Sequence, residues 1–118
     1  MSFSDILREA VERVDGAVSA MILGSDGISV EEYAAEKLLN LEDLGAEAST
    51  MIRDINLAAN DLGLGVAREF SIVSDKCGII MRQINAAYYL ALVIRPDGNY
   101  GKARFVLKTT IPKIEGEF

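Results

Sequence analysis

Residues 20–30 read AMILGSDGISV, two apolar runs joined by Ser-Asp-Gly. The apolar run over 17–24 is too short for a lone buried helix, so it predicts a central strand. Residues 27–35 alternate, less cleanly, between apolar and polar side chains and predict the strand that returns beside it. Asp26 and Gly27 suit the turn between them, because glycine adopts a positive φ without steric cost and aspartate tolerates one. The stretch therefore predicts a β-hairpin.

The Asp-Gly pair also has a passing likeness to a calcium-binding loop. An EF-hand loop needs oxygen ligands at alternate positions, a central glycine and a closing glutamate at the twelfth position. Asp26 has no acidic or amide side chain two positions away, and the segments on either side predict strands. We therefore interpret residues 25–27 as a turn and not as a metal site.

Three helices are predicted around the strands. Residues 4–15 carry apolar side chains at helical spacing behind Ser4, a suitable N-cap. Residues 43–62 carry the longest stripe of this kind, and several of its members are alanines that permit close packing. A closing helix is predicted from the spacing in YGKARFVLKTTIPKI (residues 100–114), with Pro112 expected to end it.

Three further strands are predicted after the long helix, at 66–75, 78–84 and 86–95. The third is apolar almost throughout, which is typical of a strand buried on both faces. The predicted order is αββαβββα, an α+β domain in which helices pack on a five-stranded antiparallel sheet. We expect a single domain over residues 4–114 and a frayed C-terminus at 115–118.

The composition argues against several classes of function. Lys and Arg total 12 and Asp and Glu total 18, a net charge of −6, and the basic residues are scattered along the sequence. Nucleic-acid binding needs a basic stripe, so no nucleic-acid partner is expected. No apolar run approaches the roughly 18–20 residues of a membrane span, and the N-terminus lacks a secretory signal. We expect a cytoplasmic protein without membrane insertion.

The sequence also contains no recognisable catalytic or metal-binding motif. Histidine is absent, which rules out His-based catalysis. With one cysteine and no histidine, a zinc site is unfavourable. The glycines of GLGVAR (63–68) follow a helix, whereas a dinucleotide loop follows a strand. Acidic pairs such as Asp54 and Asp61 are best interpreted as solvated charge. We expect no catalytic residues, no cofactor and no metal, and therefore a binding module.

The natural binding surfaces are the long helix and the strand that follows it. Hydrophobic residues make up 50% of the chain, rather much for a small domain, which fits either an apolar face buried by association or a rich core. In REFSIVSD (68–75), Phe70 and Ile72 share one face and Val73 lies on the other. If this is an edge strand, its open backbone groups would pair with another chain. Two copies joined there would place their long helices side by side.

The order and spacing of these segments resemble the roadblock/dynein light-chain family, and in particular its bacterial MglB-like members. The resemblance runs from Ile6 to Ile111. It rests on the hairpin above, the helix LGAEASTMIRDINLAANDLG, and the strand segments REFSIVSDKCGIIMRQIN and AYYLALVIRPDGNYGKARFVL. It implies a roadblock/longin-type fold and a homodimer formed through the strand after the long helix.

The resemblance also implies a function. MglB-like proteins bind a Ras-like GTPase of the MglA type and stimulate its GTP hydrolysis, in cell polarity and gliding motility. They reposition residues of the GTPase and supply no arginine finger, so we expect a regulator without enzymatic activity of its own, either GTPase-activating or scaffolding. The expected GTPase-contact face is Glu47, Thr50, Arg53, Asp54 and Leu57. The expected dimer interface is Phe70, Ser71, Ile72 and Val73.

A second hypothesis of a different class remains open. Phe70, Tyr88 and Tyr89 could line a small-molecule pocket, which would make the chain a ligand-sensing α+β domain with a pocket under the strand tyrosines. Aromatic side chains in strands more often fill a core or an interface.

Overall fold

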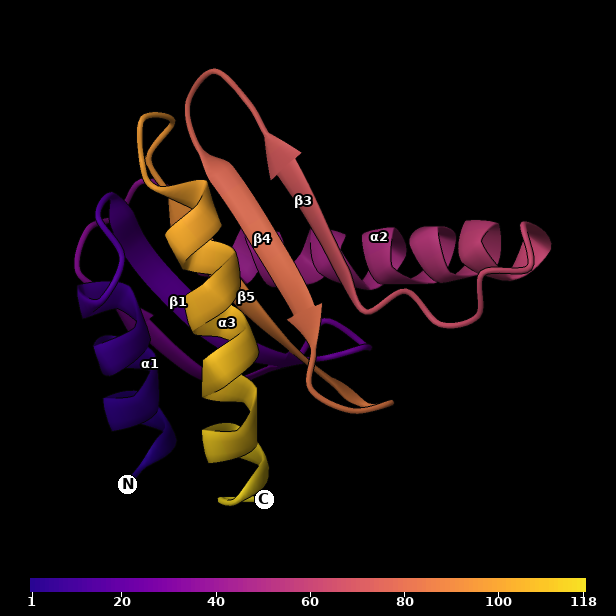
Figure 1. Cartoon of the computed structure of the whole chain (residues 1–118), viewed down its shortest axis with the longest axis horizontal. Helices are drawn as coiled ribbons and strands as arrows, with labels where there is room; N and C mark the ends of the chain where they lie inside the picture. The colour runs from indigo at the N-terminus through magenta and orange to yellow at the C-terminus, as the bar shows by residue number, and fades with distance from the viewer.

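The computed structural model describes all 118 residues of the chain. Its elements follow the predicted order αββαβββα, so the α+β class is confirmed (Figure 1). The helices are α1 (Phe3–Glu12), α2 (Leu41–Asp61) and α3 (Tyr100–Glu115). The strands are β1 (Ala17–Gly24), β2 (Ser29–Ala34), β3 (Glu69–Val73), β4 (Gly78–Gln83) and β5 (Tyr88–Ile94).

All five strands lie in one antiparallel sheet, in the order β2-β1-β5-β4-β3. β1 and β5 form its centre, and nearly every residue of these two strands is buried. Their almost continuous apolar sequence follows from this position, because a strand covered on both faces has no solvated side. β2 and β3 are the two edges of the sheet.

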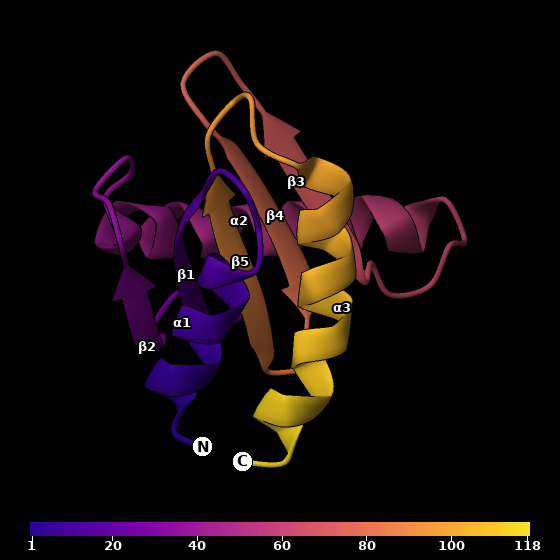
Figure 2. The ribbon, with the colours of Figure 1, turned by 60° about the vertical axis from the view of Figure 1, so that its left-hand side comes forward.

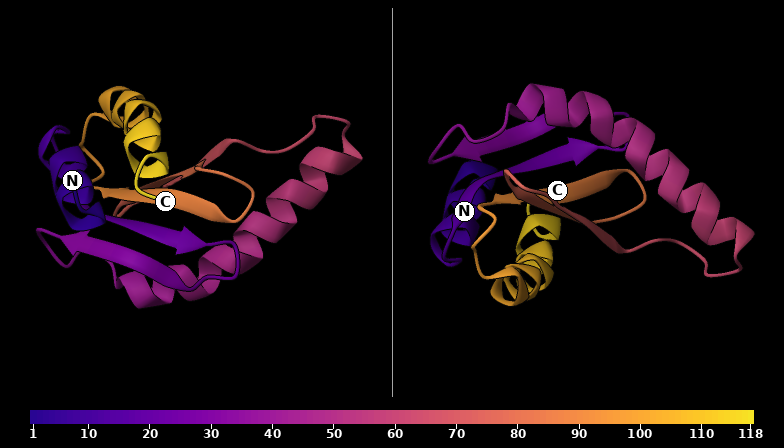
Figure 3. Two further views of the ribbon diagram at one scale, coloured as in Figure 1. Left: turned by 90° about the horizontal axis from the view of Figure 1, so that it is seen from below. Right: turned by 90° about the horizontal axis from the view of Figure 1, so that it is seen from above.

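Helices cover both faces of the sheet (Figures 2 and 3). α1 and α3 lie side by side on one face, with the two termini close together, and α2 crosses the other face. Each face has its own hydrophobic core: Ala20 and Ile22 of β1 belong to the core with α1 and α3, and Met21 and Leu23 belong to the core with α2. This alternation is the period of two that a strand imposes on its side chains.

The hairpin predicted at residues 20–30 is present, and its turn is built by Asp26 and Gly27. β1 pairs antiparallel with β2, and Gly27 has a φ of 87°. The Asp26 carboxylate accepts a hydrogen bond from the backbone N–H of Ile28 at 3.0 Å. The aspartate therefore serves the turn, as side chains of this type commonly do.

The turn also touches α2 through backbone atoms. A Cβ on Gly45 of α2 would lie 2.7 Å from the carbonyl oxygen of Gly27, and a Cβ on Gly27 would lie 2.5 Å from that of Gly45. No side chain fits between the two backbones, so the closeness of the hairpin to α2 depends on glycine at both positions.

The N-terminus of α1 differs from the prediction. Ser2, not Ser4, is the N-cap, because its hydroxyl accepts a hydrogen bond from the backbone N–H of Asp5 at 3.2 Å. A serine at either position satisfies the sequence pattern, and only the position of the first helical turn decides between them.

The end of α3 corrects another prediction. Pro112 does not end the helix, which continues to Glu115. Proline removes one helical hydrogen bond, to the carbonyl of Lys108, and that residue is exposed to water. Ile111 and Ile114 on either side are buried in the core, and this burial holds the last turn in place. Beyond it, the Phe118 ring stacks on Tyr88 with centroids 4.7 Å apart.

α2 extends beyond the sheet that it crosses (Figure 3). Its buried residues are concentrated in the first half, from Leu41 to Ile52, and only Ala59 is buried in the second. The predicted apolar stripe continued to Leu62, which is 73% exposed. The stripe is therefore wrong at Leu62, whereas Ala59 is buried as predicted. We call residues 53–61, the half of the helix with little buried surface, the α2 overhang.

One side chain connects the α2 overhang to the rest of the fold. The Asn56 amide nitrogen donates to the Tyr89 hydroxyl at 3.1 Å and to the carbonyl of Ile52 at 3.0 Å. Its amide oxygen accepts from the backbone N–H of Ala67 at 3.1 Å. Asn56 therefore joins α2, β5 and the 62–68 linker that leads into β3.

The glycine contact predicts that Gly45→Ala destabilises the protein. Alanine normally stabilises a helix relative to glycine by up to about 1 kcal/mol. Here the new methyl group meets the Gly27 carbonyl, and overpacking of this kind costs about 1–3 kcal/mol. Chemical denaturation measures the change. Gly101→Ala in α3 is the matched control, since its Cβ would meet nothing closer than 3.7 Å, and it should be neutral or stabilising. Equal stability for Gly45→Ala and wild type would contradict the contact.

The Asn56 contacts predict a local effect of Asn56→Ala. The linker amide of Ala67 and the Tyr89 hydroxyl lose their partner, so we expect a loss of about 1–3 kcal/mol in the free energy of unfolding. Hydrogen exchange should accelerate in residues 62–68 more than in β1. Asn60→Ala, one turn further along α2 at an exposed position, is the control and should change neither. An unaltered linker in Asn56→Ala would show that the linker is held by something else.

Candidate functional site

The site residues expected on α2 lie together on its exposed face. Glu47, Thr50, Arg53, Asp54 and Leu57 are all exposed, and the spacing of three and four between most of them places them on one side of the helix. Arg53 and Asp54 form a long ion pair at 3.6 Å, with side chains 74% and 65% exposed. Such a pair is worth little in water and leaves both charges available to a partner.

The residues expected at a dimer interface lie on an edge strand. β3 has one neighbour, β4, so the backbone groups along its other edge have no partner within the sheet. Ile72 and Val73 are 42% and 65% exposed, and Ser71 is exposed as well, whereas Phe70 packs against the core beneath α2. Pairing with a second chain requires an open edge, and β3 has one.

An apolar groove connects these two sets of residues, and the sequence did not reveal it. It has a volume of about 290 Å³ and lies between α2 and β3. Its lining residues are Leu39, Asp43, Leu44, Glu47, Met51, Ile72 and Ile79. The one signal in the sequence was Met51 on the apolar stripe of the helix, but only the fold places it near Ile72. The groove joins the exposed face of α2 to the open edge of the sheet.

The α2 overhang and the linker add further exposed apolar side chains. Leu57, Leu62, Leu64 and Val66 are between 59% and 73% exposed. Single exposed leucines are ordinary, but a run of four over ten residues is a candidate interaction surface.

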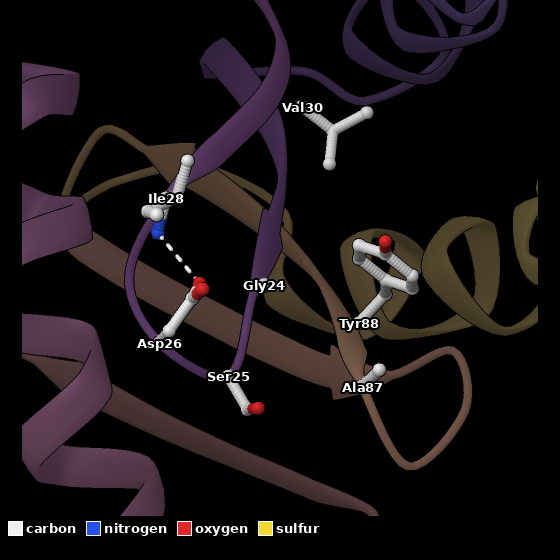
Figure 4. Close-up of a pocket in the computed structure, with 7 residues that line it drawn as sticks. All are labelled: Gly24, Ser25, Asp26, Ile28, Val30, Ala87 and Tyr88. Carbon is white, nitrogen blue, oxygen red and sulfur yellow. Dashed lines mark hydrogen bonds between the residues drawn. The ribbon is translucent and has the colours of Figure 1, made fainter.

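The two tyrosines of the second hypothesis line separate hollows. Tyr88 lines one of about 250 Å³ with the hairpin residues. Figure 4 shows its ring near Val30, with the Asp26–Ile28 hydrogen bond on the other side of the picture. Tyr89 is almost fully buried, and it lines a hollow of about 440 Å³ beneath the α2 overhang. Phe70 borders neither hollow. The fold therefore does not bring the three aromatic residues into one pocket.

An ion pair with a shifted carboxylate pKa lies away from these residues, between α1 and α3. The Lys113 ammonium hydrogen-bonds the Glu9 carboxylate at 2.9 Å, and this bond and charge hold the pKa of Glu9 below its ordinary value. The pair joins α1 to α3, on the opposite face of the sheet from α2. No three His, Cys, Asp or Glu side chains are grouped closely enough to hold a metal ion. None of the helices combines the length and the apolar composition that a membrane span requires.

Solved structures with the same fold include close matches over the whole chain. MglC from Myxococcus xanthus is 35% identical, covers 100% of both chains and superposes with a TM-score of 0.72. A roadblock/LC7 domain from Streptomyces avermitilis is 15% identical and has a TM-score of 0.88 over 99% of this chain and 98% of that chain. The gliding protein MglB from Thermus thermophilus is 19% identical and has a TM-score of 0.82 over 91% of this chain and 81% of that chain.

A further MglB structure, 19% identical with a TM-score of 0.83, has a tetrameric arrangement. No protein-family model matches the sequence, and no curated protein matches it either. The similarities below 25% identity show the fold alone, whereas the identity of 35% with MglC extends over both full chains. The predicted resemblance, with MglB and MglC as structural neighbours, is confirmed: the chain belongs to the roadblock/LC7 family.

Proposed function

We propose that this protein is a homodimeric regulator of a Ras-like small GTPase of the MglA type, acting in bacterial cell polarity or gliding motility. The single observation that carries the proposal is the open edge of β3 beside the exposed face of α2. The 35% sequence identity with MglC supports the assignment to this system, and the fold is shared with MglB, a gliding protein.

The two edges of the sheet differ in a way that favours pairing through β3. β2 carries Glu31 and Glu32 and contains a register shift opposite Ile22 and Leu23 of β1. Charges and bulges are the usual means of protecting an edge strand. β3 has a continuous register with β4 and ends in two exposed apolar side chains. A second copy is therefore the partner best suited to β3, and MglB proteins do form oligomers.

Dimerisation through β3 would also cover the apolar surface that the monomer leaves exposed. The groove between α2 and β3 and the side chains of Ile72 and Val73 lie directly beside the pairing edge. Burying apolar surface contributes about 25 cal/mol per Å², so covering this surface would favour association. The two α2 helices would then lie side by side, and their exposed faces would form one platform.

The platform carries the proposed GTPase contacts, Glu47, Thr50, Arg53, Asp54 and Leu57. It mixes both signs of charge with one large exposed apolar side chain, Leu57. An apolar centre with a polar rim is the usual anatomy of a protein interface. On this proposal the platform acts by positioning residues of its partner, as activator or as scaffold.

The dimer predicts a mass of twice the chain's 12.8 kDa in light scattering at micromolar concentration. Ile72→Asp places an unpaired charge at the pairing edge and should produce a monomer with an unaltered circular dichroism spectrum. Ile28→Asp makes the same change at an exposed position next to the other edge and should remain dimeric. A monomeric wild-type protein would refute the dimer.

The platform predicts that the protein binds a Ras-like GTPase encoded near it. Leu57→Asp and Arg53→Glu should each weaken binding by roughly tenfold, because they remove central contacts of about 1–2 kcal/mol. Arg8→Glu, an exposed arginine on α1, is the control. GTP hydrolysis then separates two roles: an activator raises the rate, and a scaffold binds without raising it. Failure to bind any such GTPase would contradict both roles.

A second candidate function, the sensing of a small molecule, has one observation in its favour. The hollow of about 440 Å³ beneath the α2 overhang is lined by Asn56, Asn60, Gln83 and the hydroxyl-bearing Tyr89. These are neutral hydrogen-bonding side chains, suited to an uncharged polar ligand. A thermal shift with a small metabolite that Gln83→Leu abolishes would support this function over GTPase regulation.

A further inference from the structure

α3 has a charge opposite to that of the protein as a whole. It carries four of the twelve basic side chains and one of the eighteen acidic ones, in a protein of net charge −6. The basic residues are Lys102, Arg104, Lys108 and Lys113, and all four are exposed. In the sequence they are separated from Arg82, but the fold brings that residue from β4 to the same place.

The basic residues in the first half of α3 are placed unfavourably for the helix itself. α1 and α2 have acidic side chains in their first turns, where the helix dipole favours them, whereas α3 has none there and has Lys102 instead. Arg104 and Lys108 are four residues apart on the helix, a spacing at which like charges repel. Lys113, in the last turn, lies where the helix dipole favours a cation, but Lys102 in the first turn and the pair Arg104 and Lys108 do not stabilise their own helix.

A single carboxylate offsets part of this charge. Glu69 of β3 bonds to Arg82 at 3.1 Å and to Arg104 at 2.7 Å, and its side chain is only 14% exposed. These three residues, with Gly101, Phe105 and Lys108, line a hollow of about 280 Å³. Lys108 has no acidic partner of its own. The hollow thus has an excess of positive charge beside a partly buried ion-pair network.

An apolar ring lies in the middle of these charges. Phe105 is 55% exposed, and the Lys102 ammonium lies 5.7 Å from the centre of its ring. Phe105 is a phenylalanine that the core does not bury. Lys102 and Lys108 nearby have no acidic partner, and an exposed aromatic ring among such cations has the composition of an interface anchor.

We propose that this surface, the α3 basic face of Arg82, Lys102, Arg104, Phe105 and Lys108, binds an acidic segment of a partner protein. Carboxylates of the segment lie against Arg104 and Lys108, and one of its apolar side chains covers Phe105. Charge complementarity selects this occupant. An anionic membrane or a nucleic acid presents negative charge over a wide area, and the acidic remainder of this protein repels it.

The α3 basic face is separate from the proposed GTPase platform. α3 and α2 lie on opposite faces of the sheet (Figure 3), so both surfaces can be occupied at once. The proposal therefore stands whether or not the GTPase assignment is correct, and it gives the protein a second partner that it could connect to the first.

Fluorescence anisotropy with a labelled peptide, Glu-Glu-Leu-Glu-Glu-Leu-Glu-Glu, tests the proposal on the full chain. We expect saturable binding that weakens as salt is raised from about 50 mM to about 500 mM, because screening shortens the reach of the charges. The same peptide with glutamine in place of glutamate should not bind. Lys108→Glu should weaken binding roughly tenfold, since it replaces an attraction by a repulsion, and Phe105→Ala should weaken it as well.

Two controls distinguish binding at this face from binding elsewhere on the protein and from loss of folding. Lys37→Glu makes the same charge change at an exposed position before α2, and it should bind the peptide as the wild type does. Lys108→Glu should unfold at the same temperature as the wild type or a higher one, because it relieves the repulsion with Arg104. The proposal is overturned if no saturable binding is seen or if Lys37→Glu weakens binding as much as Lys108→Glu. Stronger capture by phosphatidylserine vesicles than by the peptide would also overturn it, and would assign the face to a membrane surface.

Discussion

The pairing of β1 with β5 at the centre of the sheet is the constraint on which the rest of the structure depends. Both strands are buried on both faces, so their side chains are apolar in both directions. Such a pair cannot face water on either side, and it requires helices above and below it. α1 and α3 supply one layer and α2 the other. The remaining strands extend the sheet outwards, and they leave two edges of different character.

The candidate binding surfaces are the places where this core ends. α2 extends beyond the sheet (Figure 3), and its second half carries the exposed side chain of Leu57, which nothing in the monomer covers. β3 is shorter than the strands at the centre and has exposed apolar side chains at an open edge. The helix is nevertheless held at a fixed position, by the contact of Gly45 with the hairpin turn and by Asn56. A rigidly placed but uncovered apolar surface is suited to association, because little conformational entropy is lost on binding.

Local patterns in the sequence were sufficient for the fold but not for its surfaces. The Asp26–Gly27 turn and the apolar run of β5 each follow from neighbouring residues, and both were predicted correctly. The end of α3 was not, because the penalty of Pro112 is local whereas the burial of Ile114 is a tertiary effect. The exposure of Leu62 likewise depends on where the sheet ends, which a helical period does not contain.

In the candidate site, too, local sequence predicted some features and the fold alone revealed others. From the sequence, pairing through β3 depended on its being an edge strand, and the strand order places β3 at an edge. The groove that joins Met51 to Ile72 and the cluster of Arg82 with Arg104 around Glu69 unite residues from separate elements. No pattern within either element indicates such a contact, so these features became visible only with the fold.

Hydrogen exchange as a function of protein concentration decides whether β3 pairs with a second copy. β2 and β3 are both edge strands of one molecule, so each serves as a reference for the other. If the dimer forms through β3, exchange in Glu69–Val73 slows as the concentration rises, while exchange in Ser29–Ala34 does not change. Rapid exchange in β3 at every concentration, or slowing confined to β2, would show that the strand does not pair in this way.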